Sequence, residues 1–283
     1  MATIGIFDSG IGGLSVFREI RRILPCERYI YFADNAFCPY GRKSAAFIRE
    51  RAREITGLLV RQGADIIVVA CNTATAAAIA ALRAEFSDRP SEELEEWSDG
   101  RLDRLFFIGM EPAVKPAALG TRSGVIGVLA TAGTLSASKY LNTKGLYEDD
   151  VTIVEHVGEG FVELVESGVL SGPRAEGTVR ASLLPLLEAG ADTIVLGCTH
   201  YPFLLETLQK VAEEFARENG TQTARFIDPA PAVARQLLHV MDREGIFHGP
   251  VRDAGADLPA SEADLTLLSS GPSCILRDTL RLL

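Results

Sequence analysis

The chain has 283 residues, of which 47% are hydrophobic and 23% charged, so it is long enough for about two domains with buried cores. Its formal net charge of -10 argues against general nucleic-acid binding, which usually needs a basic face. No apolar run approaches the roughly 20 residues that span a bilayer, and the first residues lack the basic region of a signal peptide. We therefore expect a cytoplasmic protein with no membrane association and no direct nucleic-acid binding.

Short apolar runs alternate with longer amphipathic stretches, a pattern typical of α/β proteins with parallel strands. The predicted strands are Ile4–Phe7, Tyr29–Ala33, Asp65–Ala70, Leu105–Ile108, Gly124–Ala130, Val151–Val154, Thr193–Leu196, Arg225–Ile227 and Leu265–Leu268. The helices predicted between and after them are Leu14–Leu24, Ala45–Gln62, one from Asn72 to about Phe86, one from about Phe203, and a closing helix over Cys274–Leu283.

One charged segment, Ser87–Arg104, interrupts this alternation. It holds seven acids and three arginines among its 18 residues, together with Trp97, the only tryptophan of the chain. We interpret it as a solvated surface insertion at a domain boundary. An exposed Trp97 in such a segment would be a candidate anchor for a protein partner.

Two pairs of segments repeat along the chain. Gln62–Thr73 resembles Ala189–His200 at an offset of 127 residues, and Ile4–Ser9 resembles Ile126–Thr131 at an offset of 122. One such match between buried strands would be unremarkable, but two matches in the same order predict two related α/β halves.

The repeat predicts an α/β fold with two pseudo-symmetric, doubly wound parallel-sheet domains that face a shared active-site cleft. The first domain is expected to contain residues 1–104 and 222–283, because late strand-like segments such as Arg225–Ile227 return to it. The second is expected to span residues 105–221.

Five widely spaced cysteines without a C-x-x-C pair predict neither a disulfide framework nor a zinc site. We interpret Cys26 and Cys274 as small buried hydrophobic residues. Cys71 and Cys198 each stand between a predicted strand and a helix, where ligands bind in open α/β sheets. A helix N-terminus nearby favours the thiolate form of such a cysteine.

Two thiols that approach one ligand from opposite sides suit the inversion of a stereocentre, which needs a base on one face and an acid on the other. A thiol, with an ordinary pKa of about 8.5, can serve in either state near neutral pH. Polar groups after the strands could stabilise the developing carbanion, although each hydroxyl taken alone also fits a helix cap. These candidates are Ser9, Asn72, Thr73, Thr131, Thr134 and Thr199. Since the motifs contain no lysine for a pyridoxal Schiff base and no metal-ligand cluster, we expect neither cofactor nor metal.

Five motifs run almost end to end along the chain. They are D-S-G-I-G-G-L-S-V at Asp8–Val16, Asp34 with P-Y-G at Pro39–Gly41, A-C-N-T-A at Ala70–Ala74, L-A-T-A-G-T at Leu129–Thr134, and G-C-T-H-Y-P at Gly197–Pro202. Together they resemble the signatures of the glutamate racemases, within the aspartate/glutamate racemase superfamily. The resemblance implies cofactor-independent interconversion of L-glutamate and D-glutamate, with D-glutamate supplied to peptidoglycan synthesis.

The resemblance also implies roles for individual residues. Cys71 and Cys198 would be the two acid/base groups, assisted by Asp8 and His200 respectively, and Glu166 would act near Cys198. The substrate would be held by Ser9, Pro39, Tyr40, Gly41, Asn72, Thr73, Thr131, Thr134 and Thr199. Without the resemblance, Glu166 would be interpreted as part of a solvated helix face.

The chain departs from the family pattern at three places. Val157–Glu159 stands where many members have A-C-P, Asp228–Ala230 where D-S-G is usual, and Ser269–Pro272 where T-T-G-D is usual. These departures bear on regulation and subunit contacts rather than on the paired thiols.

Three alternative functions compete with glutamate racemisation. An aspartate racemase would share the fold but typically has glutamate where this chain has His200. A decarboxylase of the superfamily usually keeps only one of the two cysteines. A binding role toward DNA gyrase has been attributed to some family members, but nothing specific in this sequence supports it. Glutamate is thus the expected small-molecule partner, and a homodimer is left open.

Overall fold

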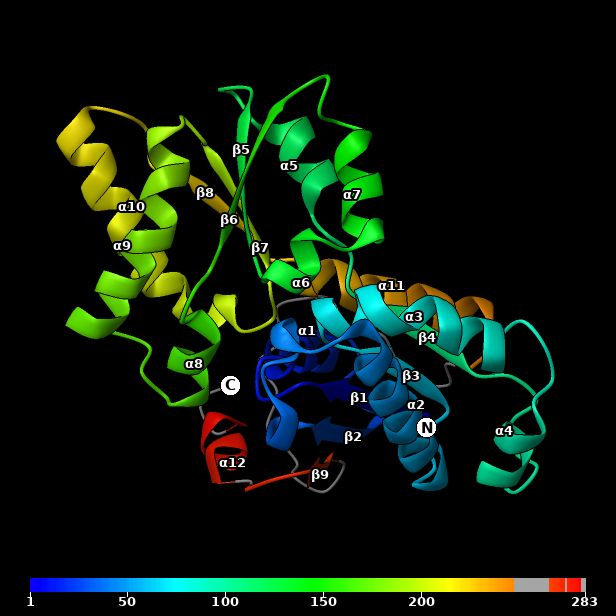
Figure 1. Cartoon of the computed structure of the whole chain (residues 1–283). Helices are drawn as coiled ribbons and strands as arrows, with labels where there is room; N and C mark the ends of the chain where they lie inside the picture. Colours follow the sequence, from blue (N-terminus) through cyan, green and yellow to red (C-terminus); the bar gives the residue numbers. More distant parts are fainter. Residues whose placement is uncertain (247–264, 273, 281–283) are drawn as a thin grey trace. The chain divides into compact units, whose positions relative to one another are not determined.

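The computed structural model describes residues 1–246, 265–272 and 274–280. The chain divides into two compact units, Met1–Met110 with Ala230–Leu283, and Glu111–Pro229. Each unit contains its own sheet, and all paired strands in both sheets are parallel (Figure 1). The predicted α/β fold with two parallel sheets is confirmed.

The first unit contains a five-stranded sheet in the order β4-β3-β1-β2-β9. Its elements are β1 (Thr3–Asp8), α1 (Leu14–Ile23), β2 (Arg28–Ala33), η1 (Asn35–Phe37), η2 (Tyr40–Arg42), α2 (Ala45–Arg61), β3 (Ile66–Val69), α3 (Asn72–Phe86), α4 (Glu92–Trp97), β4 (Phe106–Gly109), α11 (Ala230–Arg243), β9 (Leu265–Ser269) and α12 (Cys274–Leu280). Residues from α2, α3 and α4 pack on one face of this sheet to form a core, and α1 packs against α11. Because the strands are buried, they consist of nearly continuous apolar runs.

The second unit contains a four-stranded sheet in the order β6-β5-β7-β8. Its elements are α5 (Val114–Gly120), β5 (Val125–Ala130), α6 (Ala132–Leu135), α7 (Ser138–Gly145), β6 (Thr152–Val157), α8 (Phe161–Glu166), α9 (Pro173–Glu188), β7 (Thr193–Gly197), η3 (Tyr201–Leu204), α10 (Leu205–Asn219) and β8 (Arg225–Ile227). In Figure 1, α9 and α10 lie on one face of this sheet and α5 and α7 on the other, which is a doubly wound arrangement.

The two sheets repeat one strand order. When the second sheet is read in the reverse direction, its order β8-β7-β5-β6 corresponds to β4-β3-β1-β2 of the first sheet. The strand β9 is an addition to the first sheet. The register repeats as well, since Phe7 lies opposite Val69 and Leu129 lies opposite Leu196. The internal duplication inferred from the sequence is therefore present in the topology.

The repeat extends to side-chain packing. A Cβ atom added to Gly5 would lie 2.8 Å from Cδ1 of Ile67, and one added to Gly127 would lie 2.6 Å from Cδ1 of Ile194. Ile67 and Ile194 are related by the same 127-residue offset as the two cysteines. Both halves thus have a glycine at the position where an isoleucine of the neighbouring strand lies close to the backbone.

The predicted assignment of two strands to the domains is wrong. The strand predicted at Leu105–Ile108 was placed in the second domain, but β4 pairs with β3 in the first sheet. The strand Arg225–Ile227 was placed in the first domain, but β8 pairs with β7 in the second sheet. Each is the fourth strand of its own half, and a short apolar run does not reveal which sheet it will join.

The Ser87–Arg104 segment is also more integrated than predicted. It forms α4, in which Leu94 is completely buried, and it is not a domain boundary because β4 follows it in the same sheet. Trp97 packs against Phe86 with ring centroids 5.2 Å apart, and Arg53 lies over its ring. The proposed exposed tryptophan anchor is therefore wrong.

Other differences from the predicted elements are small. Most boundaries agree within one or two residues, but β6 extends to Val157, three residues beyond its predicted end. The closing helix is present as α12, and residues 281–283 of the prediction lie outside the described part of the chain. Cys26 and Cys274 are exposed rather than buried; Cys26 lies in the turn between α1 and β2, and Cys274 is the first residue of α12. Among the described residues, no helix is long and apolar enough to cross a membrane.

Candidate active site

In the first unit, Cys71 lies between β3 and α3. It has an extended backbone conformation and is the N-cap residue of α3, where its Sγ accepts a hydrogen bond from the backbone N–H of Ala74 at 3.4 Å. Its side chain is 5% exposed. Asn72 and Thr73 follow in the first turn of α3 and are also buried. The positive end of the helix dipole therefore faces the thiol, which favours the thiolate.

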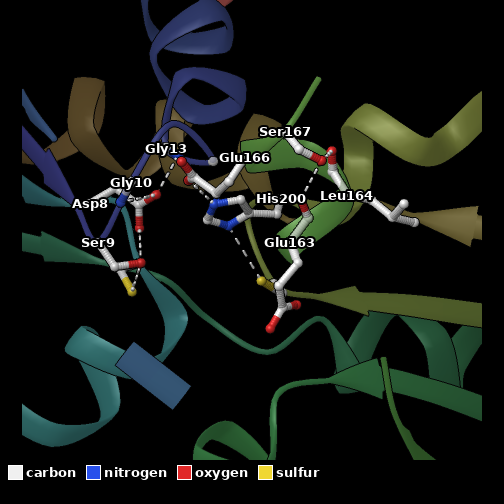
Figure 2. Close-up of polar contacts among 12 residues, drawn as sticks. Asp8, Ser9, Gly10, Gly13, Glu163, Leu164, Glu166, Ser167 and His200 are labelled. Carbon is white, nitrogen blue, oxygen red and sulfur yellow. Dashed lines mark hydrogen bonds and ion pairs between the residues drawn. The ribbon is translucent and has the colours of Figure 1, made fainter. Parts of the chain in front are cut away.

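Asp8 approaches this thiol through Ser9. The Cys71 thiol donates to Ser9 Oγ at 3.8 Å, and the Ser9 hydroxyl donates to Asp8 Oδ1 at 3.5 Å, both long contacts (Figure 2). Asp8 ends β1 and is completely buried, and its Oδ2 accepts hydrogen bonds from the backbone N–H groups of Gly13 at 2.8 Å and Gly10 at 3.4 Å. These two amides, one in the loop after β1 and one at the N-cap of α1, hold the carboxylate in place.

The second predicted loop of this unit follows β2. It contains Pro39, Tyr40 and Gly41, and the Tyr40 hydroxyl donates to Oδ2 of the buried Asp34. Burial, together with the hydrogen bond and the negative charge of Asp34, raises the pKa of Tyr40 far above its ordinary value. The charge of Cys71 raises it further, so Tyr40 lies within electrostatic range of the thiol and remains a protonated donor.

Asn72 presents a buried acceptor in this region. Its Oδ1 has no hydrogen-bond partner among the described residues, although the side chain is only 6% exposed. A buried oxygen without a donor costs free energy, so such groups in folded proteins usually have a function or a missing partner. A ligand with N–H groups would satisfy it.

In the second unit, Cys198 follows β7 and is 7% exposed. Its Sγ lies 3.8 Å from Nδ1 of His200, and Nε2 of His200 lies 2.7 Å from Oε1 of Glu166 (Figure 2). His200 is 2% exposed, whereas the Glu166 side chain is 22% exposed. Because a carboxylate only accepts, Nε2 carries the proton, and Nδ1 faces the thiol. Glu166 is therefore paired with a buried histidine and is not simply part of a solvated helix face.

Tyr201 is a buried neighbour of this second thiol site. Its ring packs edge-on against Phe161 at 4.9 Å, and its hydroxyl donates to the backbone oxygen of Gly158 at 3.4 Å. Burial, followed by the charge of Cys198, raises the pKa of Tyr201 well above its ordinary value. A Cβ atom at position 158 would lie 2.5 Å from this hydroxyl, so glycine is required at this departure from the family pattern.

The predicted threonines of the second unit lie in its loops. Thr131 caps α6, accepting from the N–H of Thr134 at 3.3 Å, and the two hydroxyl oxygens are 3.0 Å apart. Thr199 is buried directly after Cys198. The capping interpretation is thus correct for Thr131, and the same cap brings both hydroxyls to the carboxyl end of β5.

Each unit therefore gathers its own predicted residues. Asp8, Ser9, Cys71 and Tyr40 are linked by contacts or charge in the first unit, and Cys198, His200 and Glu166 in the second. Supporting residues to which the sequence analysis assigned no role are Arg51, Tyr31 and Tyr201, the last of which lies within the Gly197–Pro202 motif. No motif in the sequence indicates Arg51, because it is one of several charged residues of α2 and pairs with Glu54 one turn along the helix.

Chemically, each unit offers one buried thiol with a proton-accepting partner. A thiol beside a carboxylate or an imidazole can cycle between thiol and thiolate, as proton transfer to and from carbon requires. Within either unit taken alone, the described residues hold no group of three His, Cys, Asp or Glu side chains placed to bind a metal.

The chain is similar to known glutamate racemases in sequence. It is 45% identical over 246 residues to "Glutamate racemase" from Ectopseudomonas mendocina (strain ymp), covering 87% of this chain and 84% of the relative. It is 42% identical over 261 residues to "Glutamate racemase" from Roseiflexus sp. (strain RS-1), covering 92% and 87%. No protein-family model matches the chain.

Solved structures give the same result. The chain is similar to the Escherichia coli glutamate racemase in complex with L-glutamate and the activator UDP-MurNAc-ala, with a TM-score of 0.74 and 31% identity, covering 99% of this chain and 94% of that one. The RacE1 isoform from Bacillus anthracis gives a TM-score of 0.74 at 27% identity, covering 99% and 93%.

Proposed function

Because the chain belongs to the glutamate racemase family and is thus an amino-acid racemase, we propose that it interconverts L-glutamate and D-glutamate with Cys71 and Cys198 as its two acid/base groups. The observation that carries the mechanism is the repeat of a buried thiol two residues after Val69 in one sheet and two residues after Leu196 in the other, with matching register. The curated relatives favour glutamate over the aspartate alternative.

In the direction from D-glutamate to L-glutamate, the Cys71 thiolate removes the α-proton. Cys71 becomes a thiol, and the electron pair of the broken C–H bond is delocalised into the substrate carboxylate. Cys198 then donates its thiol proton to the opposite face of the α-carbon and becomes a thiolate. The reverse direction begins with Cys198 as thiolate and Cys71 as thiol, so each group serves as base once and as acid once.

Asp8 and the His200–Glu166 pair assist the two thiols. The Asp8 carboxylate, held by two backbone amides, accepts through Ser9 as Cys71 gains or loses its proton. On the other side, Glu166 fixes the ring of His200, so that Nδ1 stays directed at Cys198. A positioned acid/base partner of this kind contributes about 10²-fold or more to the rate.

The substrate is held by the polar groups that surround each thiol. The substrate ammonium group donates to the unpaired Oδ1 of Asn72, and Thr73, Thr131, Thr134 and Thr199 donate to its carboxylates. Ser9 and Tyr40 complete the set, with Pro39 and Gly41 shaping the loop around Tyr40. Donors aimed at the α-carboxylate stabilise the charge that develops there when the proton leaves.

The proposed mechanism uses neither pyridoxal phosphate nor a metal, because the site motifs contain no lysine for a Schiff base and hydrogen-bond donors stabilise the developing carbanion instead. Both catalytic thiols must remain reduced, which suits the cytoplasm. We assign the product D-glutamate to peptidoglycan synthesis, as implied by the family. Restoration by a metal of activity lost on chelator dialysis would contradict the cofactor-independent proposal.

Chiral analysis of glutamate incubated with the purified protein tests the function directly. Either enantiomer should be converted to an equal mixture of both, whereas aspartate should remain largely unchanged. In deuterated water, solvent deuterium should appear predominantly in the product enantiomer, because different groups remove and return the proton. Product that retains its original α-proton would argue for a single base, and an unchanged glutamate enantiomer would refute the function.

A further inference from the structure

Arg51 lies on α2, outside every motif that resembles the family, yet it makes a two-point contact with the buried Asp34. Its Nε lies 3.0 Å from Oδ2 of Asp34, and its Nη2 lies 2.7 Å from Oδ1. The Arg51 side chain is 19% exposed, whereas the Asp34 side chain is not exposed at all. The pair is thus a planar guanidinium that matches both oxygens of one carboxylate.

This pairing balances a charge that would otherwise be costly. A completely buried carboxylate is unfavourable unless it is both hydrogen-bonded and paired with a cation. The Asp34 hydrogen bond raises the pKa of Arg51 above its ordinary value despite the opposing effect of partial burial. Lysine could supply the charge but not the fork of two donors.

Asp34 transmits this constraint to Tyr40. The same Oδ2 that contacts Nε of Arg51 also accepts the hydrogen bond from the Tyr40 hydroxyl. Tyr40 is 1% exposed and interacts electrostatically with Cys71. The position of the tyrosine ring is therefore set by a carboxylate whose own position is set by Arg51.

Arg51 holds the same loop at a second point. Its guanidinium carbon lies 4.6 Å from the centroid of the Phe37 ring, and Phe37 packs against Phe47 of α2 with ring centroids 5.5 Å apart. Arg51 also pairs with Glu54, one turn further along α2. The Arg51 guanidinium therefore contacts η1 directly through Phe37 and η2 indirectly through Asp34. Both contacts hold the loop against α2, a helix of 17 residues.

We propose that Arg51 is a positioning residue for glutamate binding, which acts through Asp34 to hold Tyr40 and the loop from Asn35 to Arg42 in the substrate-competent conformation. The proposal rests on the function proposed above, with Tyr40 as a substrate-binding residue. Loss of Arg51 leaves the thiols in place but releases the loop, so substrate binding suffers more than proton transfer.

The test compares Arg51→Ala, Arg51→Lys and the wild type in steady-state racemisation of D-glutamate. We expect KM to rise about tenfold or more in Arg51→Ala while kcat changes by less than about threefold, with Arg51→Lys in between. Guanidinium chloride below its denaturing concentration should lower the KM of Arg51→Ala, and equal sodium chloride should not. Arg53→Ala is the matched control, since Arg53 is another ion-paired arginine of α2 that contacts Glu85 and Glu93, and its KM should stay at the wild-type value.

A double-mutant cycle with Tyr40→Phe shows whether the effect passes through the tyrosine. If Arg51 acts through Asp34 and Tyr40, the KM increases from Arg51→Lys and Tyr40→Phe should be less than multiplicative in the double variant. Independent effects, an unchanged KM in Arg51→Ala, or absent guanidinium rescue would each overturn the proposal. Should Arg51→Ala fail to fold, the cycle with Arg51→Lys still decides. An inactive wild type would instead refute the proposed function.

Discussion

The two thiol sites occupy equivalent positions in repeated halves, but the acid/base partners that we propose for them come from different elements. In the first unit the proposed partner is Asp8, the last residue of β1, which is linked to the thiol through Ser9. The equivalent residue at the end of β5 is Ala130, which cannot titrate. In the second unit the partner is His200, whose equivalent in the first unit is Thr73.

This difference shows what the duplication preserves. The backbone of each half places a thiol after the same strand and at the start of the following segment, whereas the partner is supplied by whichever neighbouring residue can reach it. Because enantiomers have equal free energies in water, the equilibrium constant is one, and kcat/KM is the same in both directions. The unlike partners therefore cannot make kcat/KM larger in one direction than in the other. Their separate effects should instead be visible in the rates of proton transfer at Cys71 and at Cys198.

The largest effect is expected from removing either thiol. Cys71→Ala and Cys198→Ala should each lower racemisation by more than about 10³-fold, because the intermediate cannot be reprotonated on the missing side. Serine should be nearly as damaging, since an alcohol is a much weaker acid than a thiol. Because each variant keeps one thiol, Cys198→Ala should still exchange the α-proton of D-glutamate in deuterated water, and Cys71→Ala should still exchange that of L-glutamate.

Mass spectrometry of the recovered substrate enantiomers measures this exchange, and the double variant Cys71→Ala/Cys198→Ala provides the background. Robust racemisation by either single variant would reject the two-base mechanism. Exchange of the opposite enantiomer would reverse the assignment of the two thiols.

The partners should produce the next largest effects. Asp8→Asn and His200→Gln should each lower kcat/KM by about 10²-fold, and equally in both directions. The asymmetry should appear in the isotope effect. Asp8→Asn should raise the primary isotope effect with α-deuterated D-glutamate, because proton transfer at Cys71 becomes slower, and His200→Gln should do the same with α-deuterated L-glutamate.

Thermal melting of the variants separates a loss of catalysis from a folding defect, which must be checked because Asp8→Asn also weakens the hydrogen bond from the Gly13 N–H. Ser9→Ala should shift the isotope effect in the same direction as Asp8→Asn if the contact through Ser9 matters. Equal isotope effects for both enantiomers in both variants would show that the partners do not act on separate thiols.

A smaller effect is expected from Glu166→Gln. Glutamine keeps an oxygen that can accept from Nε2 of His200 but removes the negative charge, so kcat should fall by about tenfold with KM little changed. Steady-state kinetics measures this change. Glu176→Gln is a suitable control because it removes another ion-paired glutamate of the same unit, 2.6 Å from Lys210, and it should leave kcat unchanged. An unchanged kcat in Glu166→Gln would show that the charge of Glu166 does not contribute and that His200 alone assists Cys198.

The sequence predicted the duplication and both thiols because these depend on local features, namely apolar runs that end in cysteine and recur at a nearly constant offset. It could not assign β4 and β8 to their sheets, because strand pairing is set by contacts between distant segments. It also missed Arg51, whose role depends on a carboxylate 17 residues earlier in the chain. Trp97 was misjudged because acidic neighbours indicate solvent, whereas its ring packs on Phe86 and Gly57.

The halves also differ at the opposite ends of their sheets, at two aspartates related by the 127-residue offset. Asp65 accepts from the N–H of Thr3 at 2.8 Å and pairs with the partly exposed Arg101. Asp192 accepts from four donors, which are the hydroxyls of Thr121 and Thr193 and the backbone N–H groups of Arg122 and Ser123. Partial burial raises the pKa of Asp192, but these four hydrogen bonds outweigh it and lower the pKa below its ordinary value.

The smallest predicted effect follows from this contrast. Because the pKa of Asp192 is lower in the folded than in the unfolded chain, its contribution to stability is present above the unfolded value and is lost as the pH falls through the folded value. At about pH 7, Asp192→Asn should lower the free energy of unfolding by about 1–2 kcal/mol, and the difference should shrink toward about pH 3. Asp65→Asn should cost about 1 kcal/mol or less, and less still at high salt, because its charged partner is partly exposed. Urea titrations of both variants at the two pH values measure these differences. A loss for Asp192→Asn that is independent of pH would show that its hydrogen bonds do not depend on the carboxylate charge.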